Sequence, residues 1–358
     1  MRRTTFIGLF TLLFSLGMLL TACGSGAPAT KEEPPTSANT EPTEEQPIKI
    51  YTTLYALTDF AQKIAGDKAV VENIVPPGVE PHDFEPTAKD MIKLNEGQLF
   101  IYNGAGFEGW IEKALGALQS QTLVVLDASK DIELLAADEH GHDEHAHEDE
   151  HAHDEHAKKD DHGHDHDAAK EEEHAHDEHE HGEFDPHIWL DPIKAKQQAA
   201  LIKEALIQID PANQAHYEGN FESLSQQFDN LDAAFKDLVS HIHHKEIVVS
   251  HAAFGYITNA YGLVQIPISG LSPSNEPSPK QLQQIISMAK EHEIEFILFD
   301  TLVSSKVAEV VKREVGAEAL TLNTLENLTQ EELSQGKDYF SVMYDNIETL
   351  KKALEYHK

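Results

Sequence analysis

The chain has few basic residues: 27 Lys and Arg stand against 63 Asp and Glu, and the formal net charge is −36. Proteins that bind nucleic acid need Lys and Arg to neutralise phosphates, so this balance argues against a nucleic-acid partner. A strongly acidic chain is suited to attracting cations. Solubility alone explains the charge equally well, so the charge by itself does not decide the function.

Cysteine is almost absent, and the single residue, Cys23, excludes an intramolecular disulfide. A basic start at residues 1–3 precedes an apolar run over residues 6–20 that is too short to span a bilayer comfortably. We therefore predict a cleaved export signal over residues 1–22. The sequence LTAC at residues 20–23 resembles a bacterial lipobox, which implies lipidation of Cys23; a buried free thiol is the alternative. Residues 23–47 then form the lipidated cysteine and a flexible tether rich in Pro, Thr, Glu and Ser.

Residues 138–183 contain no aliphatic side chain larger than alanine, but they hold 14 of the 23 histidines and 20 acidic residues against 3 Lys. Such a segment cannot bury enough apolar surface to offset the entropy of ordering, so we predict a disordered insertion. It is expected to bind metal weakly and without fixed geometry. It would collect Zn²⁺ near a tighter site, sense zinc sufficiency, or act only as an acidic linker. The candidate weak ligands are His140, His142, His145, His147, His151, His153, His156, His162, His164, His166, His174, His176, His179 and His181.

Apolar strands alternate with helical stretches on both sides of this insertion, which indicates parallel sheets in α/β layers. The first four strands are expected at 48–54, 70–75, 98–104 and 122–128, and the last four at 246–251, 263–269, 295–300 and 318–323. Between them, helices are expected near 192–208 and from 210–211 to about 240. A helix of that length would cross stiffly from one domain to the other.

The predicted fold class is therefore α/β, with two domains, each a four-stranded mostly parallel sheet with flanking helices, joined by one long rigid helix. The N-terminal domain covers residues 48–190 and includes the insertion at 138–183. A helical region with the linker helix covers 191–244, and the C-terminal domain covers 245–358. No residue-level repeat relates the two halves.

Potential metal ligands follow several of the predicted strands. In open parallel sheets, ligands bind outside the carboxyl ends of the strands. His82 lies in the loop after the second strand, His251 ends the fifth, Asp300 ends the seventh, and His187 closes the crossover that carries the insertion. Three imidazoles and one carboxylate form a tetrahedral set that suits Zn²⁺ better than Mn²⁺ or Mg²⁺.

Each of these residues also has a purely structural interpretation. His82 would be an ordinary loop residue, His187 would satisfy a helix start, His251 would be a hydrogen-bonded core histidine, and Asp300 would cap the following turn. Spacing alone does not exclude the carboxylates that neighbour His82, which are Glu80, Asp83 and Glu85.

The sequence lacks the usual motifs of metal-dependent and serine hydrolases. It contains no HExxH and no Gly-x-Ser-x-Gly nucleophile elbow. A fully ligated tetrahedral ion would also leave no open position for catalysis. We therefore expect a protein that is not an enzyme.

The lipobox together with EPHDFEPT, FDPHIWLDP, VSHAAFGYI and LFDTLVSSKVAE resembles the zinc-binding lipoproteins that feed bacterial ABC importers. The resemblance covers nearly the whole chain from Cys23 onward. It implies two α/β domains joined by a rigid helix and one Zn²⁺ in the cleft between them. It carries the ligand role onto His82, His187 and His251. The fourth position varies in this family, which leaves Asp300 as the candidate.

The same resemblance implies a monomer, anchored by lipid at the extracytoplasmic face of the cell membrane, that works with a membrane permease. The manganese branch of the family has a carboxylate where this chain has His251, which favours zinc. Two alternatives stay open: a receptor for Mn²⁺ or another divalent metal, and a zinc-stapled adhesin or structural lipoprotein. A stapled protein should unfold without its metal, whereas a receptor with two self-sufficient cores should stay folded.

Overall fold

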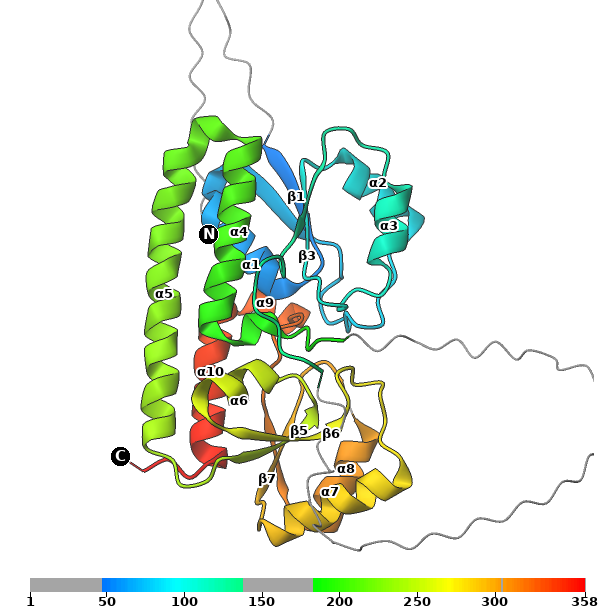
Figure 1. The fold of residues 1–358 in the computed structure, drawn as a ribbon, viewed down its shortest axis with the longest axis vertical. Coiled ribbons are helices and arrows are strands. Elements are labelled where there is room, and N and C mark those ends of the chain that lie inside the picture. The colour runs from blue at the N-terminus through cyan, green and yellow to red at the C-terminus, as the bar shows by residue number, and fades with distance from the viewer. Residues whose placement is uncertain (1–46, 138–182, 304, 358) are drawn as a thin grey trace, which may run out of the picture. The chain divides into compact units, whose positions relative to one another are not determined.

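The computed structural model describes residues 47–137, 183–303 and 305–357 (Figure 1). All of them belong to one compact unit, Gln46–Lys358. The predicted signal peptide, Cys23, nearly all of the tether and the 14 histidines of the insertion lie outside the described residues.

The N-terminal lobe, residues 47–137 with 183–190, is built on a four-stranded sheet with the strand order β2-β1-β3-β4. All of its strand pairs are parallel, as expected for strands joined by crossover connections that contain helices. Its elements are β1 (Ile48–Thr52), α1 (Tyr55–Ala65), β2 (Ala69–Asn73), α2 (Ala88–Glu96), β3 (Leu99–Tyr102), α3 (Ile111–Ala117) and β4 (Val124–Asp127).

The C-terminal lobe, residues 245–357, repeats this arrangement in the order β6-β5-β7-β8, again with all pairs parallel. Its elements are β5 (Glu246–His251), α6 (Gly255–Tyr261), β6 (Val264–Ser269), α7 (Pro279–Glu291), β7 (Phe296–Phe299), α8 (Lys306–Val315), β8 (Glu318–Thr321), α9 (Gln330–Ser334) and α10 (Tyr339–Ala353). The prediction of two four-stranded parallel α/β sheets is therefore confirmed.

Two helices connect the lobes: α4 (Pro192–Ile209) and α5 (Gln214–Ser240). Asp191 caps α4 by accepting a hydrogen bond from the Ile193 amide, and Pro192 occupies the first helical position, where no amide donor is needed. The predicted long helix is present, although its first residues, Pro211–Asn213, form a separate 3-10 turn. The 27 residues of α5 span about 40 Å at 1.5 Å per residue. This helix runs alongside α4 and passes both sheets (Figure 1).

The buried face of α5 joins the cores of the two lobes. Phe228 packs edge-on against Phe60 of the N-terminal lobe, with ring centroids 5.2 Å apart. Two turns further along, Phe235 stacks on Tyr261 of the C-terminal lobe at 4.9 Å. One cluster of buried apolar residues therefore continues through both lobes, and smaller clusters lie elsewhere in each lobe. The lobes share a core, which differs from the two self-sufficient cores expected from the sequence.

Candidate metal centre

His82 lies in a proline-rich loop between β2 and α2, and the C-terminal lobe holds this loop in place. The side-chain amide of Asn327 donates hydrogen bonds to the carbonyls of Pro76 (2.7 Å) and Val79 (3.0 Å). The His82 side chain is only 8% exposed, and its ring packs against Phe107 with centroids 4.5 Å apart. The loop is thus stiff, and the imidazole points into the interior.

The neighbouring Glu80 is occupied by the backbone of the same loop. Its carboxylate accepts hydrogen bonds from the amides of His82 (3.0 Å) and Asp83 (3.2 Å). Burial, countered in part by His82 and reinforced by Glu326, raises the pKa of Glu80 to about 7. Glu80 therefore supports the loop and is not one of the groups that converge with His82.

His187 immediately precedes a short 3-10 helix, Ile188–Leu190, and is fully buried. Asp185 fixes it twice: its Oδ1 accepts a hydrogen bond from the His187 amide at 2.9 Å and lies 2.8 Å from Nδ1. In the neutral form that binds a metal, Nδ1–H donates to this carboxylate and leaves the lone pair on Nε2, which faces the centre. A carboxylate behind a histidine in this way is the usual support of a metal ligand.

His251 is the last residue of β5 and is also buried. Its position follows from the sheet, because the carboxyl end of β5 opens toward the N-terminal lobe. Asp300, directly after β7, stands behind the ring with Oδ2 3.9 Å from Nδ1, which is too long for a hydrogen bond.

Glu326 belongs to the loop after β8 and is completely buried. The preceding residue, Leu325, has φ +57°, a left-handed conformation that costs a non-glycine residue about 1 kcal/mol. Its amide donates to Asn323 Oδ1 at 2.7 Å, and the Glu326 carbonyl accepts from the Tyr55 amide at 2.9 Å. These bonds hold the strained turn that aims the Glu326 carboxylate inward.

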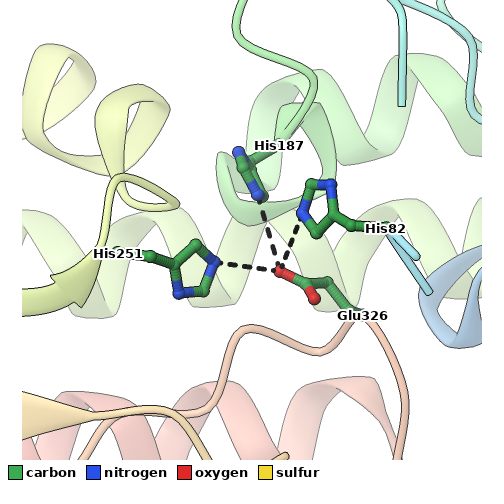
Figure 2. Close-up of side chains that lie close together, drawn as sticks. All are labelled: His82, His187, His251 and Glu326. Atoms are coloured by element: carbon green, nitrogen blue, oxygen red, sulfur yellow. Dashed lines mark hydrogen bonds and ion pairs between the residues drawn. The ribbon is translucent and has the colours of Figure 1, made fainter. Parts of the chain in front are cut away.

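The four side chains meet at one point (Figure 2). Glu326 Oε1 lies 3.7 Å from His82 Nε2, 3.5 Å from His187 Nε2 and 3.3 Å from His251 Nε2. A tetrahedron with metal–ligand bonds of about 2.0–2.1 Å has edges of about 3.3 Å, so these separations are close to those of a filled zinc site. One donor atom from each residue lies within 4.8 Å of the others.

Several of these atoms are buried without a hydrogen-bond partner: Nε2 of His82, Nε2 of His187 and Oε2 of Glu326. Buried polar atoms are nearly always paired, because an unpaired one costs about 1–3 kcal/mol. A cation at the centre would satisfy the imidazole nitrogens at once. The chemistry of three neutral nitrogens and one carboxylate suits Zn²⁺.

The electrostatics agree with a site built for positive charge. Burial alone would raise the pKa of Glu326, but the three surrounding histidines hold it well below its usual value. Burial would likewise lower the pKa of His187, yet Asp185 and Glu326 raise it to about 9. Metal binding at Nε2 would therefore displace a proton from His187, because metal ligands must be deprotonated.

The structure brings together His82, His187 and His251 but not Asp300. The pKa of the Asp300 carboxyl is raised by burial and by the nearby Glu326. Its oxygens accept hydrogen bonds from Thr324 Oγ1 (2.9 Å) and the Leu302 amide (2.8 Å) instead of facing the centre. Glu326 is the fourth member of the cluster instead, and no expectation from the sequence pointed to it. It lies five residues past the end of β8, a strand of the same sheet as β5, so a wider window after the strand ends would have included it without singling it out.

The accessory histidines at 140–181 and Cys23 lie outside the described residues, so the structure does not place them. In the three described ranges, no helix is long and apolar enough to cross a membrane.

Comparison with known proteins places this geometry among metal-binding proteins. Residues 50–353 match the family model for ZnuA, the zinc-uptake complex component A, periplasmic. The chain is similar to the high-affinity zinc uptake system protein ZnuA of Bacillus subtilis (strain 168), with 33% identity over 347 residues and 97% of each chain covered.

It is also similar to the zinc-binding lipoprotein AdcA of Streptococcus pneumoniae (strain ATCC BAA-255 / R6), with 32% identity over 308 residues. That match covers 86% of this chain but only 56% of AdcA. The crystal structure of the Zn(II)-bound ZnuA-like domain of S. pneumoniae AdcA superimposes with a TM-score of 0.66 and 30% identity, covering 87% of this chain and 100% of that domain.

Proposed function

Because the chain belongs to the ZnuA family of zinc-uptake proteins, we propose that it captures one Zn²⁺ between its lobes and delivers the ion to the permease of an ABC importer. The observation that carries this proposal is the convergence of three imidazole nitrogens on one carboxylate oxygen inside the protein. We propose His82, His187, His251 and Glu326 as the ligands.

This ligand set favours zinc over manganese and transport over catalysis. Mn²⁺ prefers more oxygen ligands than one carboxylate supplies. A tetrahedral ion held by four protein groups has no open position for water or substrate, which catalytic zinc requires. The ion is therefore cargo.

We further propose that the receptor is anchored outside the cytoplasmic membrane through lipidated Cys23 and acts as a monomer. The motif at residues 20–23 and the similarity to a zinc-binding lipoprotein support the anchor. In this scheme the histidine-rich residues 140–181 are accessory. They raise the zinc concentration near the cleft without forming the tight site.

Release of the ion would involve local movement rather than a wide hinge closure. A continuous core along α5 resists large rotation of the lobes. Two ligands, His82 and Glu326, lie on loops that contact each other through Asn327. Small-angle scattering profiles of the empty and zinc-bound protein should nearly coincide, and a large compaction on binding would contradict this mechanism.

The experiment that tests the function is a competition titration of Zn²⁺ against Mn²⁺ with a chromophoric chelator, on the soluble chain from residue 24. It compares the wild type, a variant lacking residues 140–181, and His82→Ala with His251→Ala in that deletion background. We expect the deletion to keep one tight zinc site and the double substitution to remove it. Tight binding that disappears with the deletion alone would locate the receptor site in residues 140–181.

Circular dichroism of the metal-free protein tests the structural alternative. A zinc-stapled adhesin or structural protein unfolds when the metal is removed, because the binding free energy of a structural metal is folding free energy. The shared apolar core predicts that the empty receptor keeps its secondary structure. Loss of helical signal on chelation would favour the staple.

A further inference from the structure

A second set of histidines lies where α5 ends and the last described residues pass it, before the start of β5 and so at the opposite end of that strand from His251 (Figure 1). His241, His243 and His244 follow α5, and His357 follows α10. Exposed histidines at the C-terminus of a helix are ordinarily solvated groups that the helix dipole favours. In the structure, these histidines contact one another and neighbouring side chains.

The rings of His243 and His357 are in contact. Their centroids are 4.9 Å apart and their planes are inclined by 62°. The cleft offers a measure for this distance, because its three imidazole pairs, which converge on one point, have centroid separations of 5.3, 5.7 and 6.3 Å. Measured between ring centroids, the surface pair is therefore at least as closely spaced as the imidazoles of the cleft.

The two segments that carry the pair are fixed to each other. The His357 amide donates a hydrogen bond to the His241 carbonyl at 2.9 Å. One residue earlier, the Tyr356 hydroxyl donates to Asp237 Oδ2 at 3.2 Å, and its ring lies 5.4 Å from that of His241. The contact between His243 and His357 is therefore supported by backbone and side-chain hydrogen bonds between their two segments.

The surroundings favour a cation. His244 Nε2 lies 3.4 Å from Glu355 Oε2, so the two segments that carry the pair also bring a carboxylate to this end of α5. The C-terminal carbonyls of the 27-residue α5 carry partial negative charge that adds to this field. Negative charge near exposed imidazoles raises the local concentration of divalent cations.

We propose that His243 and His357 form a second metal site, which binds a divalent ion of the class that prefers imidazole, such as Zn²⁺, Cu²⁺ or Ni²⁺. Water completes the coordination, because the site is open to solvent. With two protein nitrogens in place of four buried donors, it binds more weakly than the cleft. The bound ion would tie the C-terminal segment to the end of α5. This site does not depend on the proposed transport function.

Chemical modification of histidine in the full chain tests the site residue by residue. Diethyl pyrocarbonate acylates free imidazole nitrogens but not metal-bound ones, and peptide mapping by mass spectrometry reports each histidine separately. The reagent is applied over a Zn²⁺ titration. We expect the rates at His243 and His357 to fall together, by about tenfold when free zinc reaches about ten times the dissociation constant of the site.

His243→Ala is the decisive variant, and it removes only an exposed side chain. It should restore the reactivity of His357 to the zinc-free value while leaving the cleft histidines protected. His292 serves as the matched control, because it is half-exposed and its Nδ1 lies 4.0 Å from Glu246 Oε1. It should stay reactive throughout. Zinc-independent modification of His357, or protection of His357 that persists in His243→Ala, would overturn the proposal.

Discussion

The two lobes have the same strand order but support the residues that we propose as metal ligands differently. In the N-terminal lobe, His187 is hydrogen-bonded to Asp185 at 2.8 Å. In the C-terminal lobe, the carboxylate in the equivalent place, Asp300, stays 3.9 Å from His251. Topology thus brings a histidine to the centre from each lobe, but the local loops decide how firmly each is held.

The carboxylate ligand also comes from one lobe only. The C-terminal lobe supplies Glu326 through a strained turn at Leu325, whereas in the N-terminal lobe the nearby Glu80 is turned to its own backbone. The charge of the site is therefore asymmetric, and substitutions at matching places in the two lobes should have unequal effects.

The largest effect is expected for Glu326→Gln. The substitution removes the negative charge on which the three imidazoles converge and leaves one oxygen as a weak ligand. We expect the zinc affinity to fall by more than about 100-fold, beyond the 10–100-fold typical of residues that only support a ligand. Isothermal titration calorimetry or a competition titration with a chelator measures this loss of zinc affinity.

Asp300→Asn is the matched control for that substitution, because Asp300 is also buried and also follows a strand of the same sheet. It should cost much less affinity than Glu326→Gln. If Asp300→Asn were the more damaging change, Asp300 would be the fourth ligand and the geometry of the cleft would need revision.

The second-largest effect on zinc affinity is expected for Asp185→Asn. The side-chain carbonyl of asparagine is an uncharged and therefore weaker acceptor for Nδ1–H. His187 then loses its fixed orientation and part of its basicity. Zinc affinity should fall about 10–100-fold. In the same titration, Asp300→Asn should lower the zinc affinity by less than Asp185→Asn does, because the Asp300 carboxylate makes no hydrogen bond to His251. Equal losses would show that the lobes support their histidines alike.

Gly255→Ala tests the same support from the opposite lobe. A Cβ at Gly255, which begins α6, would lie 2.3 Å from Asp185 Oδ2, so the carboxylate must move. We expect about a tenfold loss of zinc affinity, smaller than for Asp185→Asn because the charge remains. Unchanged affinity with an intact fold would mean that Asp185 can shift without disturbing His187.

Most of the fold follows from the sequence, because buried parallel strands are continuous apolar runs and helices have a different period. The histidines could be found by the same logic, since His251 ends β5 and His82 follows β2. Strand ends alone do not single out Glu326. It lies five residues past the end of β8, and its direction depends on the left-handed turn at Leu325 and on a hydrogen bond to Tyr55, an N-terminal-lobe residue.

Asp300 was the natural choice from spacing because it directly follows β7, yet its oxygens are taken by Thr324 and Leu302. The short helix α9 also lacks a clear hydrophobic period, although Thr329 and Glu332 form a capping box at its start. In both cases hydrogen bonds made by loop residues decide the local structure. Hydrophobic periodicity carries no information about them.

The smallest effect is expected for Gly219→Ala in α5, which tests whether the lobes share one core. Gly219 is exposed, and nothing lies within 4 Å of a Cβ there, so alanine should stabilise the helix by about 0.5–1 kcal/mol. Zinc affinity should not change. Gly262→Ala is the control: its site is equally free of neighbours but has φ +68°, so alanine should destabilise the protein by about 1 kcal/mol. Because α5 packs on both lobes, calorimetry should show each substitution shifting one common transition. Two transitions, of which only one moves, would mean that the lobes unfold separately and that α5 connects them without coupling their stability.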